Sequence, residues 1–132
     1  MKHIAILCLG SNIGNARACL HQALEALDAV GCVRSASEAY TTPDDTGRGN
    51  AYTNMVVSLA TESRLDRLCD FLHSLETAAG RIPASKAMAV MPLDIDIVVW
   101  DGSIISPYDY SRPYFTRGYA RIQQLQPRHV SE

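Results

Sequence analysis

The sequence lacks a strong excess of charge of either sign. Its 132 residues carry 12 Lys and Arg against 14 Asp and Glu, which gives a net charge of −2. Proteins that hold nucleic acid in bulk need a clustered excess of basic residues, so we expect no nucleic-acid partner. An anionic small molecule such as a nucleotide would need a metal ion to offset its charge.

Long hydrophobic runs and paired cysteines are also missing. No segment approaches the roughly 20 apolar residues of a membrane span, and the apolar run near the N-terminus is too short for a secretory signal. The cysteines, at positions 8, 19, 32 and 69, form no Cys-x-x-Cys pair, so zinc-site spacing is absent. We therefore expect a cytoplasmic protein without a membrane partner, whose thiols are reduced and mostly in the core.

What remains is the composition of an ordinary globular protein, with 47% hydrophobic and 20% charged residues. A chain of this length can bury one core without disulfides, so we predict a single domain over residues 1–132. We expect a monomer, with a weak dimer as the alternative.

Hydrophobic periodicity changes repeatedly between that of strands and that of helices. Apolar or alternating runs predict strands over residues 3–9, 32–41, 52–60 and 93–100. Leucines three and four apart predict helices that begin near residues 15 and 64 and end at Gly31 and Gly80. Residues 42–50 and 81–92 lack a period and should be loops, and a last helix should begin near Tyr114.

This order predicts an α+β fold, a ferredoxin-like βαββαβ sandwich. Its antiparallel sheet would carry both helices on one face and leave the other face open for substrate.

Two aspartates interrupt the most apolar strand. Residues 92–100 read PLDIDIVVW, so Asp94 and Asp96 should point to one face, roughly 7 Å apart, with Leu93, Ile95, Ile97 and Val99 on the other. Two such carboxylates are unfavourable unless one keeps a proton or a cation lies between them. Mg²⁺ suits the pair because it takes one or two carboxylates together with water and phosphate. The alternative is that both are ordinary strand charges facing water.

Five short motifs occur in order along the chain: LGSNIG at 9–14, YTTP at 40–43, YTNMVV at 52–57, ETAAGR at 76–81 and PLDIDI at 92–97. Together they resemble the 6-hydroxymethyl-7,8-dihydropterin pyrophosphokinase family of folate biosynthesis. The resemblance implies transfer of a pyrophosphoryl group from ATP to the hydroxymethyl oxygen of the pterin, with AMP as the leaving group. Two Mg²⁺ ions would be held by Asp94 and Asp96, and the partners would be a pterin and ATP.

The resemblance also implies roles for single residues. Arg81 would act in catalysis with Asp94 and Asp96. The pterin would contact Thr42, Pro43, Tyr52, Asn54 and Tyr119. ATP would contact Ile97, Ser111 and Arg117. Without the resemblance, plainer interpretations remain: an exposed sheet face for Tyr52 and Asn54, a turn at Thr42 and Pro43, a cation at a helix C-terminus for Arg81 and core packing for Tyr119.

The segment before the aspartates departs from the family pattern. Met88 and Met91 stand where the family has a Trp and an Arg, and Tyr114 stands where it has a His, which leaves Arg81 and Lys86 as cations of that loop. Each lost charge-assisted phosphate contact costs on the order of 1.5–3 kcal/mol. Candidates to replace them are Arg48, Arg112 and Arg121.

Three alternatives to a working kinase therefore stay open. The first is an impaired pterin-binding or regulatory relative that has lost its ATP-side residues. The second is a metal-dependent enzyme acting on another nucleotide or heterocycle. The third is a ferredoxin-like RNA-binding protein, which the aspartates on the open face disfavour because they repel phosphate.

Overall fold

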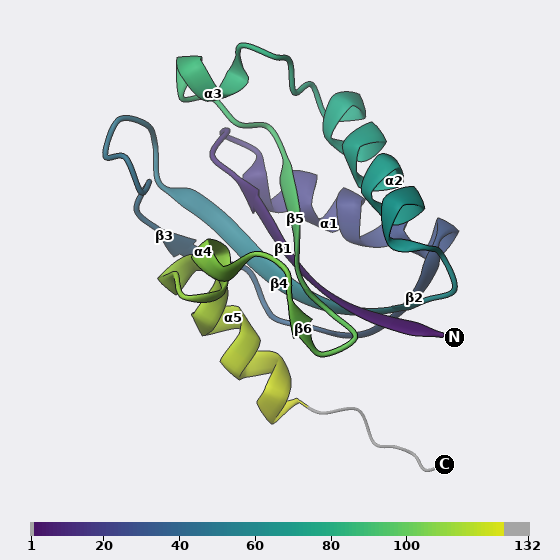
Figure 1. Cartoon of the computed structure of the whole chain (residues 1–132). Coiled ribbons are helices and arrows are strands. Elements are labelled where there is room, and N and C mark those ends of the chain that lie inside the picture. The colour runs from purple at the N-terminus through teal and green to yellow at the C-terminus, as the bar shows by residue number, and fades with distance from the viewer. Residues whose placement is uncertain (1, 126–132) are drawn as a thin grey trace.

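A six-stranded antiparallel sheet forms the centre of the molecule (Figure 1). The computed structural model describes residues 2–125, so residues 1 and 126–132 of the predicted domain lie outside the described part. The strands are β1 (His3–Ser11), β2 (Gly31–Ala36), β3 (Tyr40–Thr42), β4 (Tyr52–Thr61), β5 (Asp94–Trp100) and β6 (Ser103–Ile104). Their order is β2-β4-β1-β5-β6, and β3 pairs with β4 beyond the end of β2. The prediction of an α+β chain with an antiparallel sheet is confirmed, whereas the ferredoxin-like arrangement stays a prediction.

Five α-helices and one 3₁₀ segment accompany the sheet within residues 2–125. They are α1 (Ala16–Ala26), η1 (Leu27–Ala29), α2 (Leu65–Ala78), α3 (Ser85–Met88), α4 (Pro107–Tyr110) and α5 (Pro113–Gln124). Throughout this part of the chain, every helix is too short or too polar to cross a membrane.

The larger core lies between one face of the sheet and helices α1 and α2. Alternate residues of β1, including Leu7 and Leu9, pack there against Leu20 of α1 and Leu72 of α2. The leucine spacing that predicted these two helices is therefore the spacing that buries them, as expected for amphipathic helices on a sheet.

The second face of the sheet is also covered by a helix, so the prediction of helices on one face only is wrong. Phe115 and Ile122 of α5 pack against Ile6, Cys8 and Val56, which point away from α1 and α2. The last helix was expected from sequence, but its apolar stripe was not assigned to a face. Burying that stripe leaves only the end of the face nearest β3 for a ligand.

Val99 points to the opposite face of the sheet from Ile95, and not to the same face as predicted, because the pairing of β5 with β1 is irregular. Leu7 pairs with Ile97 but Ile6 pairs with Val99, so the register shifts by one residue at Val98. Val98 and Val99 consequently both join the core beneath α5, while Trp100 packs on the other side. A β-bulge of this kind turns the side chains beyond it to the opposite face.

Several element boundaries also needed correction. The predicted strand 32–41 is divided into β2 and β3, the predicted loop 81–92 contains the short helix α3, and β6 and α4 were not predicted. All four cysteines are free, as expected, but Cys32 and Cys69 are exposed rather than in the core.

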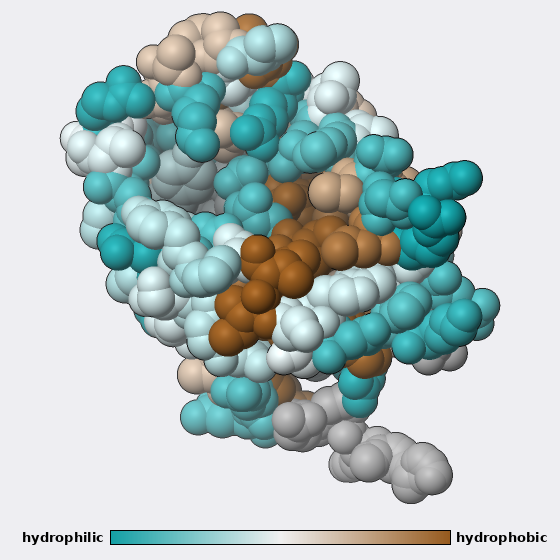
Figure 2. Space-filling view, viewed as in Figure 1, coloured by the Kyte–Doolittle hydropathy of each residue, from teal (hydrophilic) through white to brown (hydrophobic). Residues whose placement is uncertain are grey.

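Figure 2 shows where hydrophobic side chains reach the surface on the side of the molecule that faces the viewer in Figure 1. They form a band over β6, whose Ile104 is 46% exposed, whereas the loop between β3 and β4 is mostly hydrophilic.

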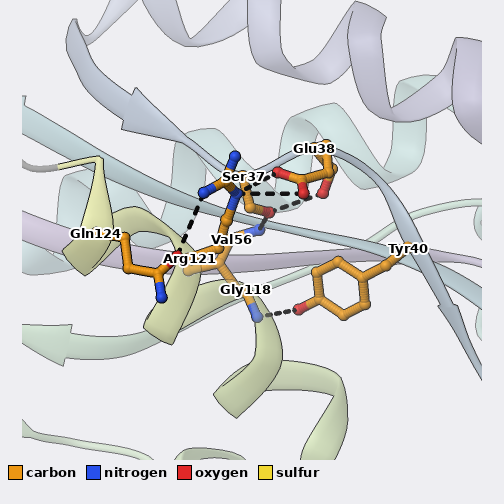
Figure 3. A network of polar contacts seen from close by, with 7 residues as sticks. All are labelled: Ser37, Glu38, Tyr40, Val56, Gly118, Arg121 and Gln124. Atoms are coloured by element: carbon orange, nitrogen blue, oxygen red, sulfur yellow. Dashed lines mark hydrogen bonds and ion pairs between the residues drawn. The ribbon is translucent and has the colours of Figure 1, made fainter.

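Polar contacts fix α5 on the sheet (Figure 3). The Tyr40 hydroxyl accepts a hydrogen bond from the Gly118 backbone N–H at 3.0 Å and donates one to the Tyr114 carbonyl at 2.6 Å. Further along the helix, Arg121 pairs with Glu38 at 3.1 Å.

Candidate functional site

A cavity of about 440 Å³ opens at the end of the sheet where β1 finishes and β5 begins. Its walls come from β1, the loop between β3 and β4, the start of β4 and β5, the segment after α2, and α4. The lining residues are Cys8, Gly10, Thr42, Pro43, Asp44, Asp45, Thr46, Tyr52, Asn54, Arg81, Lys86, Asp94, Asp96, Tyr108, Asp109 and Tyr114. Seven of the eight residues predicted to act in catalysis or pterin binding line this one cavity, although they come from segments far apart in the chain.

Asp94 and Asp96 both line the cavity, as the alternation of β5 predicted. They lie beside β1, where Asp94 is opposite Gly10 and Asp96 is opposite Cys8. Burial of Asp96, with the charges of Asp94 and Asp109 nearby, raises its pKa to about 8. Without a cation, one proton is therefore retained near this pair at neutral pH.

Arg81 joins the end of α2 to the beginning of β5. Its Nη1 lies 3.0 Å from Asp94 Oδ1 and 3.1 Å from Glu76 Oε2. Glu76 is buried, which raises its pKa, and its Oε2 also accepts a hydrogen bond from the Ile95 backbone N–H at 2.8 Å. Arg81 therefore neutralises part of the charge of Asp94, while the Asp94 side chain stays 36% exposed toward the cavity.

Glu76 is a residue of this arrangement to which the sequence reasoning gave no role. The available signal was an acidic residue on the apolar stripe of α2, four positions after Leu72. A glutamate at such a position is buried and requires a hydrogen-bonded or charged partner.

Four of the predicted pterin contacts lie along another wall. Thr42 and Asn54 are buried on the paired strands β3 and β4, and the Asn54 amide donates to Thr42 Oγ1 at 2.8 Å. Pro43 begins the following loop and Tyr52 faces the cavity beside them. Burial and the charge of Asp94 raise the pKa of Tyr52. This wall places hydrogen-bonding side chains next to the aromatic ring of Tyr52, which suits a flat heterocycle with polar edges.

The other four predicted contacts do not line the cavity. Tyr119 stacks on Phe115 with ring centroids 5.0 Å apart, in the core beneath α5. Arg117 donates to the Thr41 carbonyl at 3.1 Å and lies over the Tyr40 ring. Ile97 packs toward α1 and α2, and Ser111 donates to the Tyr108 carbonyl at 2.9 Å. Their roles toward pterin and ATP stay predictions.

Asp109 and Tyr114 are cavity residues that sequence reasoning did not identify as a pair. The Tyr114 hydroxyl donates to Asp109, and Ser106 donates to the other oxygen of the same carboxylate at 2.6 Å. Burial and Asp109 raise the pKa of Tyr114. No periodic signal marks Asp109 because it lies in the four-residue helix α4, which the sequence did not predict.

Negative charge predominates among the lining residues. Five are aspartates, at positions 44, 45, 94, 96 and 109, and two are cations, Arg81 and Lys86. A polyphosphate could enter such a cavity only with cations of its own.

The donors present fit Mg²⁺ that also binds phosphate, and they do not make a closed metal site. Within residues 2–125, no group of three or more His, Cys, Asp or Glu could hold a metal ion. Two carboxylates that share a cavity, one of them carrying a raised pKa, form an incomplete set of hard oxygen ligands. Mg²⁺ characteristically completes such a set with water and substrate oxygens.

Comparisons with known proteins agree with this geometry. The model of the family 7,8-dihydro-6-hydroxymethylpterin-pyrophosphokinase (HPPK) matches residues 6–124. The chain is also 34% identical over 106 residues to the 2-amino-4-hydroxy-6-hydroxymethyldihydropteridine pyrophosphokinase of Methylorubrum extorquens. That alignment covers 77% of this chain and 66% of the relative, slightly less than two thirds of its length. The family match begins within β1 and extends over the other five strands, both aspartates and α5, and the chain therefore belongs to the 7,8-dihydro-6-hydroxymethylpterin-pyrophosphokinase family.

Proposed function

We propose that the chain transfers a pyrophosphoryl group from ATP to 6-hydroxymethyl-7,8-dihydropterin in folate biosynthesis. The hydroxymethyl oxygen forms a bond to the β-phosphorus of ATP, the bond from that phosphorus to the α,β-bridging oxygen breaks, AMP leaves, and the hydroxyl proton is released. The observation that carries the proposal is that Asp94 and Asp96 share one cavity with Thr42 and Asn54. A carboxylate pair for a metal–polyphosphate complex thus lies beside a polar wall for a heterocycle.

The cavity residues have two kinds of role in this proposal: some hold the metal ions that offset the charge of the polyphosphate, and others position the pterin. Asp94 and Asp96 would hold two Mg²⁺ ions, whose chemistry when bound is to neutralise the charge of the polyphosphate. Arg81, fixed by Glu76, orients Asp94. Thr42, Pro43, Tyr52 and Asn54 position the pterin so that its hydroxymethyl group faces the carboxylates. Holding both reactants in line is the larger part of catalysis in phosphoryl transfer.

The sheet topology and the family resemblance support further parts of the proposal. The strand order β2-β4-β1-β5 with α1 and α2 on one face supports a ferredoxin-like core. We assign ATP contacts to Ile97, Ser111 and Arg117 and a pterin contact to Tyr119 on the family resemblance. The free cysteines support a cytoplasmic location, and a monomer remains our expectation.

The decisive experiment is to incubate the full chain with ATP, Mg²⁺ and the reduced hydroxymethylpterin and to quantify AMP by chromatography. We expect one AMP for each pterin consumed. Asp94→Ala should lower the rate by at least a hundredfold, because the cavity loses one of its two charged metal ligands. Asp66→Ala removes an exposed aspartate in an ion pair with Arg64 and is the matched control, with an unchanged rate.

The excess of aspartates in the cavity favours one alternative, a pterin-binding relative without kinase activity. That function predicts pterin binding by calorimetry with no AMP formed under any Mg²⁺ concentration. Such a result would contradict the proposed transfer.

A further inference from the structure

We propose that Arg112 and Tyr108 form a phosphate-binding subsite at the rim of the cavity, and that the Asp45 carboxylate fills it until a polyphosphate displaces it. This inference rests on the proposed function, which supplies the polyphosphate.

The geometry is that of an anion already bound. Asp45 lies in the loop between β3 and β4, Tyr108 is in α4, and Arg112 lies between α4 and α5. The Tyr108 hydroxyl donates to Asp45 Oδ2 at 3.1 Å, and Arg112 Nη2 lies 3.5 Å from Asp45 Oδ1. The guanidinium is held over the Tyr108 ring, 5.1 Å from its centroid. A guanidinium and a hydroxyl that contact the two oxygens of one carboxylate can donate in the same way to two oxygens of a phosphate.

Asp45 is a poor match for this pair of donors. Its distance to Arg112, 3.5 Å, exceeds the 3.0–3.1 Å of the ion pairs of Arg81 and Arg121. The Arg112 Nε atom is buried and has no hydrogen-bond partner in the described structure. The two side chains are 38% and 32% exposed, so solvent screens their attraction. A polyphosphate, with more charge and more acceptor oxygens, can therefore compete for Arg112.

The cavity needs the cation that this exchange would release. Arg81, one of its two lining cations, is already shared between Glu76 and Asp94. Of the arginines that could replace the family's lost cations, Arg121 pairs with Glu38 and Arg48 donates to the Lys86 carbonyl at 3.4 Å. Among these arginines, Arg112 is the one whose recorded ion-pair partner is a cavity-lining residue.

Release of Asp45 does not require the loop to unfold. Its turn is organised by the neighbouring Asp44, whose Oδ2 accepts hydrogen bonds from Thr46 Oγ1 at 2.5 Å and from the Gly49 backbone N–H at 3.0 Å. The side chain of Asp45 can turn outward while these bonds persist.

The test measures binding of inorganic tripolyphosphate with Mg²⁺ to the full chain by calorimetry. Asp45→Asn should bind about five- to tenfold more tightly, because the competing anion is gone. Arg112→Gln should bind about tenfold more weakly, the effect of losing one charge-assisted contact. The matched controls are Glu38→Gln and Arg121→Gln, which make the same charge changes in the ion pair between Glu38 and Arg121 of α5 (Figure 3) and should stay within twofold of the parent.

The double variant separates a local subsite from a general charge effect. If Asp45 acts by occupying Arg112, Asp45→Asn should bring no gain once Arg112 is Gln. Three results would overturn the subsite. The double variant could show the full gain in affinity expected of Asp45→Asn, or Asp45→Asn could bind with unchanged affinity. The third is that neither the parent nor Asp45→Asn binds tripolyphosphate. Should Arg112→Gln fail to fold, Tyr108→Phe replaces it and should weaken binding about threefold.

The outcome is independent of the AMP assay. Tighter binding in Asp45→Asn without AMP formation supports the subsite and contradicts the proposed kinase. AMP formation by the parent, with no change in tripolyphosphate affinity in Asp45→Asn, supports the proposed kinase and contradicts the subsite.

Discussion

At the scale of single residues, Asp96 is a buried carboxylate whose charge is unfavourable in the cavity. Burial and two neighbouring carboxylates raise its pKa to about 8, whereas an aspartate in an unfolded chain titrates near 3.9. From about pH 4 to pH 8 the folded protein therefore binds more protons at this site than the unfolded chain does. The free energy of unfolding contributed by Asp96 must fall as pH rises through that interval.

This cost predicts that Asp96→Asn stabilises the metal-free protein. At pH 8 the variant should exceed the parent by up to about 4 kcal/mol in free energy of unfolding, because the amide needs no proton to remain beside Asp94. At pH 5 the two should be nearly equal. Urea titrations in the presence of a chelator measure both values, with Asp66→Asn as the exposed control. A variant less stable than the parent at pH 8 would contradict this account.

The residue scale also shows which site residues the sequence can predict. Asp94 and Asp96 lie on a strand with clear alternation, so their common direction follows from the period of a strand. Thr42 and Asn54 were named by the family resemblance, and Thr42 lies in β3, where the sequence predicted a loop. Asp109 lies in a single helical turn, which has too few residues for any period. Its place beside Asp96 is set by the way α4 follows β6, a tertiary contact that the sequence pattern does not encode.

At the scale of elements, α5 lies so close to the sheet at Gly118 that no side chain fits between them. A Cβ added at Gly118 would lie 2.5 Å from Val56 Cγ2 and 2.6 Å from the Tyr40 hydroxyl. That hydroxyl accepts a hydrogen bond from the Gly118 N–H (Figure 3) and donates one to the Tyr114 carbonyl, so it cannot move without breaking both contacts. The glycine is therefore needed for space.

We accordingly predict that Gly118→Ala lowers the free energy of unfolding by about 2–4 kcal/mol, the range for overpacking at a buried contact together with loss of hydrogen bonds. Gly14→Ala is the matched control, because no atom lies within 4 Å of the added Cβ. Its stability should change by less than about 0.5 kcal/mol. Chemical denaturation measures both, and equal losses in the two variants would show that α5 tolerates a wider separation.

The elements also show where sequence prediction ends. The leucine stripes of α1 and α2 predicted both these helices and the faces they bury. Alternation predicted the strand β4, but both of its faces are buried. The alternation of β5 failed at Val99, since a register shift depends on the partner strand and leaves no mark in the order of Ile97, Val98 and Val99. Coverage of the second face by α5 was missed for a related reason: an amphipathic stripe predicts burial but not the surface that buries it.

At the scale of the whole molecule, the cavity is assembled from segments far apart in sequence. Cys8 comes from the first strand and Tyr114 from the last helix, with residues of the loop 43–50 and of β5 between them. A ligand that contacts all these walls binds only when the whole sheet and α5 are in place. Its binding energy therefore adds to the stability of the complete fold and not to that of one part.

Metal and nucleotide should for this reason raise the melting temperature together and not separately. With Mg²⁺ and a non-hydrolysable ATP analogue tenfold above its dissociation constant, the added stability is about 1.4 kcal/mol, or roughly 4 °C for a domain of this size. The analogue with a chelator should give almost no shift, because five cavity aspartates then face the phosphates with two cations. Mg²⁺ alone should give a small one, since two carboxylates leave most of its ligands to water. Differential scanning calorimetry distinguishes the cases, and Asp94→Asn should remove the joint shift. Equal shifts with and without Mg²⁺ would mean that the nucleotide is held elsewhere, away from Asp94 and Asp96.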